Sequence, residues 1–176
     1  FPTGESNIQY SNETIKTRPI VASCDGPTDV ISWFLQQMLC PLLNYVPSHL
    51  VNTSEFLQKL RNCEIANAKV EYQTFDVSAL YTNVDTDVAI KCCLDSLREH
   101  QEDLQLYGLL PEEIEELLCA AVKFNIFRFN NVVYKQERGL AMGNRLAPLL
   151  AILFMDSFER SCLTTSILYY GRYIDD

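Results

Sequence analysis

The segment Val70-Glu-Tyr-Gln-Thr-Phe-Asp76 alternates between apolar and polar residues and ends on a carboxylate. Alternation of this kind is typical of a half-buried β-strand, so the pattern predicts a strand that delivers Asp76 at its end. A second run, Ser166–Ile174, predicts a last strand that ends on Asp175 and Asp176. We therefore expect two strands with carboxylates at their ends in this fold.

Apolar residues at helical spacing occur before and between these strands. They predict helices that begin at Asp29 with a break at Pro41, near Thr53, after the Asp85 cap and at Pro111, and a buried helix over Leu149–Phe158. Residues 126–134, with an Asn-Asn turn, predict a β-hairpin, Pro19–Ser23 predict a short strand, and residues 1–17 predict a loop. The order of elements predicts one α+β domain whose small, mainly antiparallel sheet has helices packed on one face.

The composition is that of an ordinary globular domain. The 176 residues are 48% hydrophobic and 21% charged, which excludes disordered, collagen-like and low-complexity classes. The longest apolar run, Leu146–Met155, is about half the length that a bilayer-spanning helix needs, so we expect no membrane segment. The opening residues Phe1–Glu5 lack the basic and apolar pattern of a secretory leader, and they indicate a cut from a longer protein.

The cysteines and histidines do not form a recognisable metal or nucleophile pattern. The seven cysteines are odd in number, and none stands in a CxxC motif or at zinc-finger spacing from a histidine. This pattern predicts reduced, mostly buried thiols in an intracellular protein. His49 and His100 are far apart in the sequence. Zinc chemistry and a Cys/His nucleophile pair are therefore not expected.

Charge is unevenly distributed along the chain. The net charge of −9 by itself argues against a nucleic-acid partner. However, residues 85–116 hold ten acidic residues against two basic ones, whereas residues 123–145 hold five basic residues against one acidic residue. One interpretation is an acidic back with a basic groove, and the other is two solvated faces.

Three carboxylates form the strongest chemical pattern. Asp76 ends one predicted strand, and Asp175 with Asp176 ends another. Adjacent carboxylates in an apolar setting repel each other and are desolvated, which is costly unless a cation joins them. Mg²⁺ is such a cation, since it binds one or two carboxylates together with phosphate oxygens, and a pair of ions can clamp both oxygens of an in-line displacement. An ordinary Asp-Asp turn is the alternative for the dipeptide alone.

Segments of this sequence resemble the catalytic motifs of reverse transcriptases, in the order of that family. Thr74–Val84, which contains Phe-Asp-Val-Ser-Ala-Leu-Tyr-Thr-Asn-Val, is similar to the first motif. Gly139–Pro148 is similar to the second, Tyr173–Asp176 to the third, and Arg18–Val21 to the fingers segment that precedes them. The amino-acid sequence of the first motif, together with Gly-Leu-Ala-Met-Gly, most resembles that of Penelope-like retroelements. The resemblance covers about residues 16–176.

The resemblance implies roles for the acidic residues and for one aromatic residue. Asp76 and Asp175 match the metal-binding aspartates, and Asp176 matches the third acidic residue of a site for two Mg²⁺ ions, with Mn²⁺ as a possible substitute. Tyr81 matches the aromatic position under the incoming sugar, where a flat ring would clash with a 2′-hydroxyl and so select deoxynucleotides. An ordinary core tyrosine is the alternative for Tyr81.

The resemblance also implies nucleotide-binding roles elsewhere. Arg18, and less clearly Lys16, match the fingers residues that meet the triphosphate. Met142 and Gly143 match the turn beside the primer-template and the nascent base pair, where glycine permits close backbone approach. A plain glycine at a helix entry is the alternative. The sequence departs from the family at Asn144-Arg145, where Ser-Pro is usual.

The resemblance implies a partial reverse transcriptase domain over residues 1–176: fingers and connecting helices over about 1–70, and mostly a palm over about 71–176, with the last catalytic hairpin cut at Asp176. The implied activity is that of an RNA-directed DNA polymerase, a nucleotidyltransferase of a nuclear retrotransposon. Such an enzyme adds deoxynucleoside triphosphates to a primer on an RNA or DNA template, and we expect the fragment alone to be inactive. The alternative is an inactive or domesticated copy that binds nucleic acid or a protein partner. A palm-like nucleotidyl cyclase would need a Gly-Gly-rich metal turn, which the sequence lacks.

Overall fold

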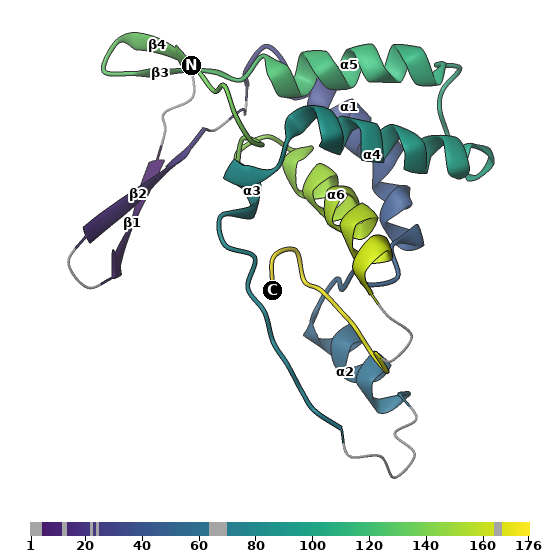
Figure 1. Ribbon diagram of the computed structural model, residues 1–176. Coiled ribbons are helices and arrows are strands. Elements are labelled where there is room, and N and C mark those ends of the chain that lie inside the picture. The colour runs from purple at the N-terminus through teal and green to yellow at the C-terminus, as the bar shows by residue number, and fades with distance from the viewer. Residues whose placement is uncertain (1–4, 12–13, 22, 24, 64–69, 164–166) are drawn as a thin grey trace.

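The computed structural model describes the chain except for residues 1–4, 12–13, 22, 24, 64–69 and 164–166, and it describes residues 5–19 through their backbone (Figure 1). Its elements, in chain order, are β1 (Glu5–Ser11), β2 (Thr14–Ile20), α1 (Asp29–Leu39), the 3-10 helix η1 (Cys40–Tyr45), α2 (Thr53–Arg61), α3 (Leu80–Asn83), α4 (Thr86–Glu99), the 3-10 helix η2 (Gln101–Asp103), α5 (Pro111–Lys123), β3 (Ile126–Phe129), β4 (Val132–Lys135) and α6 (Ala147–Cys162). The predicted mixture of helices with small antiparallel pairings is therefore confirmed.

Four helices enclose the hydrophobic core. Figure 1 shows α4 and α5 side by side, with α6 crossing below them, and α5 also contacts α1. Each helix contributes fully buried apolar side chains, such as Leu35, Leu97, Ile114 and Leu150. Burial of each such side chain contributes about 1.5–3 kcal/mol to folding. Residues before and after position 70 thus share one core.

The predicted helix starts are confirmed where a local signal marks them. The Asp85 carboxylate accepts hydrogen bonds from the N–H groups of Asp87 and Val88 at the start of α4. Pro111 is the first residue of α5, where its missing N–H costs no helical hydrogen bond. α1 ends just before Pro41, and η1 continues the chain there.

The strands differ from the prediction. In the described chain they form two separate antiparallel hairpins, β1–β2 and β3–β4, and not one sheet beneath the helices. The β3–β4 hairpin is confirmed, and Asn130 and Asn131 have φ angles of 48° and 61°, as a tight two-residue turn requires. Residues 5–11 and 14–20, which were expected to be mostly loop, form β1 and β2, and β2 ends at Ile20, within the short strand expected at Pro19–Ser23.

The two strands expected to carry the carboxylates were wrongly predicted. Residues 70–77 have no regular structure, and side chains 71–76 are exposed. The described part of the other run, residues 167–174, has a single isolated bridge between His49 and Arg172. An alternating pattern becomes a strand only when a neighbouring strand pairs with its backbone, and in the described chain neither run has one.

The cysteines are less buried than expected. Six of them are described, all with free thiols, and only Cys93 is fully buried, whereas Cys40 and Cys162 are exposed. Burial raises the pKa of the Cys93 thiol to about 12, so that thiol is inert at neutral pH. Among the helices described, none has the length and apolar character needed to cross a membrane.

Candidate active site

Two segments that are far apart in the sequence meet beside Asp76. The N–H of Val77 donates a hydrogen bond of 2.9 Å to the carbonyl oxygen of Asp175. Figure 1 shows the long segment before α3 passing the C-terminal turn at this point. Asp76 is exposed and Asp175 is half-buried. One backbone hydrogen bond therefore joins the segments that carry two of the predicted site residues.

The C-terminal residues form a tight turn. The N–H of Tyr173 donates to the carbonyl of Asp176 at 2.8 Å, and the N–H of Asp176 donates back to the carbonyl of Tyr173 at 3.1 Å. Between them Ile174 has φ of 60°, a left-handed conformation that is unfavourable for a β-branched side chain. Such a conformation costs about 1–3 kcal/mol and persists only where its surroundings hold it. The turn presents Asp175 and Asp176 side by side in the chain.

Tyr81 lies on α3, next to the same turn. Its side chain is half-buried, and this burial raises its pKa, as does the negative charge of Asp175. The carbonyl oxygen of Tyr81 accepts a 2.7 Å hydrogen bond from the N–H of Leu140. The backbone of Tyr81 thus links the segment around Asp76 to the Gly139–Pro148 segment. The side chain of Tyr81 is close enough to Asp175 for that negative charge to act on its hydroxyl.

Gly139 permits this close approach. Its φ is +78°, and a Cβ atom there would lie 2.5 Å from the carbonyl oxygen of Tyr81 and 2.8 Å from Cα of Thr82. The hydroxyl of Thr86 donates to the carbonyl of Gly139 at 3.3 Å. The sequence analysis quoted Gly139 in a motif without giving it a role. Its role in the structure is to let two backbones touch.

Asn144 and Arg145 replace the usual Ser-Pro of the resembled family, and both have structural partners. The Asn144 side chain is buried, donates to the carbonyl of Ala121 in α5 at 2.7 Å, and accepts from the N–H of Leu146 at 2.9 Å. Arg145 forms a 2.7 Å ion pair with Asp29 at the start of α1, and its hydrogen bond lowers the pKa of that carboxyl. The segment that begins α6 is thereby tied to α1 and α5.

The other predicted nucleotide-binding residues lie in the segment between β4 and α6 and in the β1–β2 hairpin. Met142 and Gly143 are half-buried in the segment between β4 and α6. Lys16 and Arg18 lie on β2, opposite Gln9 and Asn7 of β1, and their side chains are outside the described residues. Figure 1 shows the β1–β2 hairpin projecting away from the helices.

The structure also places a charged pair that the sequence analysis missed. Arg172 and Glu159 are both buried and form an ion pair directly before the C-terminal turn. The sequence signals were a glutamate near the end of the mostly apolar α6 and an arginine next to Tyr173. Each signal by itself is compatible with a surface position, so neither pointed to a buried contact.

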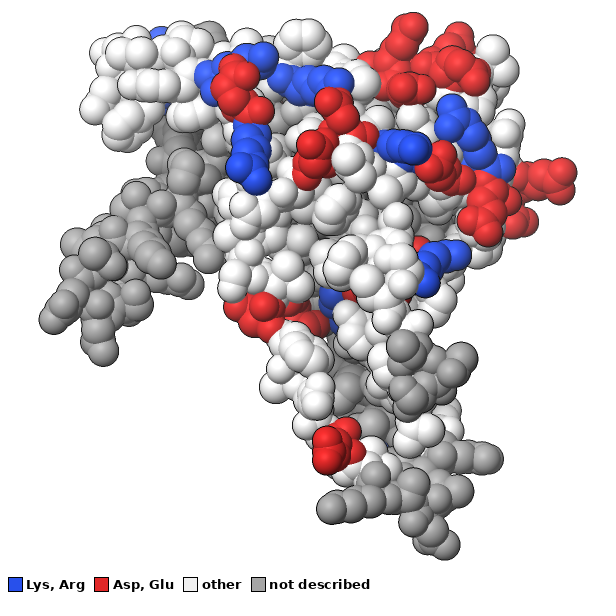
Figure 2. Space-filling model, viewed as in Figure 1, with Lys and Arg blue, Asp and Glu red and all other residues white. Residues whose placement is uncertain are grey.

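The carboxylates do not form a complete metal centre by themselves. Among the described residues, no three or more His, Cys, Asp or Glu side chains form a group that could hold a metal ion. Figure 2 shows an acidic patch beside the C-terminus. Mg²⁺ needs only one or two carboxylates when phosphate oxygens supply further ligands, and Asp76 with Asp175 offers that number.

Two of the five basic residues of the 123–145 run are paired with acids of the same chain near α4 and α5. Lys123 pairs with Asp87 at 2.6 Å and Lys135 pairs with Glu137 at 3.8 Å, at a shallow pocket of about 200 Å³ between α4, α5 and β4. Figure 2 shows blue and red side chains interleaved over these elements. This pairing favours the interpretation of solvated faces for most of the run.

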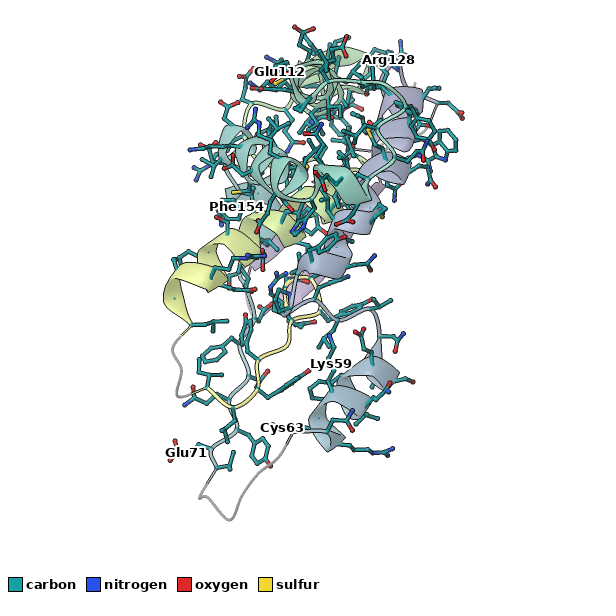
Figure 3. The ribbon with its side chains drawn as sticks, turned by 90° about the vertical axis from the view of Figure 1, so that its right-hand side faces the viewer. Lys59, Cys63, Glu71, Glu112, Arg128 and Phe154 are labelled. Carbon is teal, nitrogen blue, oxygen red and sulfur yellow. The ribbon has the colours of Figure 1, made fainter. Side chains whose placement is uncertain are left out.

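The surroundings of the C-terminal segment come from α2. Figure 3 shows this segment between α2, which carries Lys59, and the loop that carries Glu71, and Cys63 lies just beyond the end of α2. The Cys63 thiol lies 3.7 Å from the carbonyl oxygen of Leu168, and Lys59 donates to the carbonyl of His49 at 3.1 Å. The rings of Phe56 on α2 and Tyr169 also lie 6.1 Å apart, so α2 packs against the C-terminal segment.

No protein-family model matches this sequence, and no curated protein matches it.

Proposed function

We propose that this chain is part of a reverse transcriptase, an RNA-directed DNA polymerase of a retroelement, and that Asp76 and Asp175 belong to its nucleotidyl-transfer site. The observation that carries the proposal is the hydrogen bond from the Val77 N–H to the Asp175 carbonyl. It joins the segments that resemble the first and third motifs of that family. The link from Leu140 to Tyr81 adds the segment that resembles the second.

The site residues have distinct tasks in this proposal. Asp76 and Asp175 would hold Mg²⁺, or Mn²⁺ in its place, which when bound neutralises charge on the transferred phosphate. Tyr81 would exclude a 2′-hydroxyl through its ring, with its backbone fixed by Leu140 and Gly139. The exposed Asp76 leaves room for a triphosphate. The partners are a primer on an RNA or DNA template and deoxynucleoside triphosphates, and nuclear localisation follows from the resemblance.

A domain that binds without catalysis is the second candidate. One observation on the described residues favours it: no three or more His, Cys, Asp or Glu side chains form a group that could hold a metal ion. Such a domain would use the same fold to bind nucleic acid or a protein. The two candidates differ in whether Asp76 and Asp175 bind a divalent ion together with a nucleotide.

Binding of Mn²⁺ separates the candidates. We predict that the 176-residue chain binds Mn²⁺ more tightly when dATP is present, because phosphate oxygens complete the ligand set. Asp76→Asn and Asp175→Asn should each weaken this binding by about tenfold or more, since each removes a charged ligand. The measurement is the electron paramagnetic resonance signal of free Mn²⁺ during titration.

The matched control is Glu71→Gln, which removes an exposed acid from the same loop as Asp76. It should leave the Mn²⁺ affinity unchanged. If Asp76→Asn, Asp175→Asn and the wild type bind Mn²⁺ and dATP equally, the polymerase proposal is wrong and the non-catalytic candidate stands.

A further inference from the structure

A buried ion pair lies directly behind the turn that carries Asp175 and Asp176. The side chains of Arg172 and Glu159 are 3% and 6% exposed, and the Arg172 Nε donates to Glu159 Oε1. Its Nη2 lies 3.4 Å from the other carboxylate oxygen. The pair joins α6 to the C-terminal segment where both are covered by protein.

The guanidinium also holds the turn itself. Arg172 Nη1 donates to the carbonyl oxygen of Ile174 at 2.7 Å, and Nη2 donates to the carbonyl of Ile152 in α6 at 3.2 Å. Ile174 is the residue with φ of 60°, and its peptide leads directly into Asp175. A planar fork of donors thus fixes a left-handed residue against a core helix.

Glu159 is held in turn by neutral groups. Its Oε2 accepts from the Ser48 hydroxyl at 2.6 Å, and its Oε1 accepts from the Tyr170 hydroxyl at 2.9 Å. Burial, together with the bond to Glu159, raises the pKa of Tyr170 to about 12, so Tyr170 stays a donor at neutral pH. The Arg172 backbone also bonds to Ser48 and Leu50, at 2.7 and 3.0 Å. These hydrogen bonds from several directions hold the side chains of Glu159 and Arg172 in a single arrangement.

Stability alone does not explain such a pair. Burying two charges costs several kcal/mol per ion before their attraction repays it, and well-packed apolar replacements are often equally stable. What an apolar pair lacks is directional donors, and here those donors reach the carbonyl that precedes Asp175. The network orients the backbone of the turn, because a directional donor of Arg172 reaches the Ile174 carbonyl within it.

We propose that Arg172, oriented by Glu159, is a positioning residue that sets the backbone of the 173–176 turn and so holds Asp175 against the segment of Asp76. The role of these carboxylates in metal binding rests on the function proposed above, whereas the positioning of the turn does not. Positioning residues behind metal ligands typically change metal affinity by about 10–100-fold.

The test uses the whole chain with three variants and two readouts. Arg172→Lys keeps a positive charge without the fork. The double variant R172M/E159L removes both charges, so no uncompensated charge is left buried if the lysine variant fails to fold. Arg160→Lys is the matched control, because Arg160 pairs with Asp156 in the same helix at 2.7 Å and bonds to the carbonyl of Tyr45, away from the turn, at 3.3 Å. The readouts are hydrogen exchange of the Val77 amide and Mn²⁺ affinity with dATP.

We expect Val77 exchange to accelerate by about tenfold or more and Mn²⁺ affinity to fall by about tenfold or more in both test variants. Exchange of the α4 and α5 amides should stay as in the wild type, and R160K should change neither readout. Folded variants with wild-type Val77 exchange would overturn the proposal. If the wild type binds no Mn²⁺ while Val77 exchange still depends on Arg172, the positioning role stands and the proposed function fails.

Discussion

At the scale of single residues, Gly139 and Tyr81 show how close the segments approach. The glycine has no Cβ that could meet the Tyr81 carbonyl, and its positive φ suits only glycine without strain. The motif that contains Gly139 could be read from the sequence, but the backbone that it touches could not, because the contact depends on a fold that joins residues 139 and 81.

Replacing Gly139 should therefore destabilise the protein more than replacing a glycine with the same conformation in open space. Gly139→Ala adds an atom within 3 Å of the backbone of residues 81 and 82, and overpacking of this kind typically costs about 1–3 kcal/mol. Gly108→Ala is the matched control, because Gly108 has φ of +84° with nothing within 4 Å of the added atom. Urea unfolding would measure both, and equal losses would contradict the contact at Gly139.

At the scale of elements, the sequence predicted the structures that depend on contacts within one helical turn. It did not predict the structures that depend on a distant partner. The Asp85 cap and Pro111 mark helix starts by contacts within one turn, so the sequence predicts α4 and α5 well. The alternation at 70–75 meets every local condition for a strand, yet a strand also needs a partner backbone, which no local pattern supplies. The Arg172–Glu159 pair escaped prediction for the same reason.

The ion pair of Arg145 with Asp29 joins the segment before α6 to the start of α1, and it leads to a pH-dependent prediction. Its hydrogen bond, followed by that from the Asp25 N–H, lowers the pKa of Asp29 from its usual 3.8. A lowered pKa in the folded state stabilises the protein above the unfolded-state pKa, and this stabilisation is lost as pH falls through the folded-state value. Arg145→Gln should therefore raise the Asp29 pKa and reduce stability at pH 7 more than at pH 3.

Carboxyl ¹³C titration by NMR would measure the Asp29 pKa directly. Arg98→Gln is the control, since it also removes an arginine charge, and Arg98 pairs at 3.6 Å with exposed Asp95 on α4 rather than with Asp29. An Asp29 pKa that is the same in Arg145→Gln and in the wild type would show that the pair does not persist in solution.

At the scale of the whole molecule, the core helices position the candidate site although they do not carry its carboxylates. α6 carries Glu159 and supports the C-terminal turn, while α3 and α4 follow the loop of Asp76. The order of the motif-like segments was readable from the sequence, and the structure brings their backbones together at Val77, Asp175, Tyr81 and Leu140. The expected sheet beneath them is replaced by loops, so this contact depends on the buried pair and on the core.

If Asp76 and Asp175 together bind one nucleotide-bound ion, as we propose, anomalous scattering from crystals of the chain grown with Mn²⁺ and dATP should locate that ion. We predict a Mn²⁺ peak bonded to both carboxylates, whose carbons then lie within roughly 8 Å of each other. A Mn²⁺–dATP complex bound elsewhere, or Asp76 more than about 15 Å from Asp175, would contradict the account.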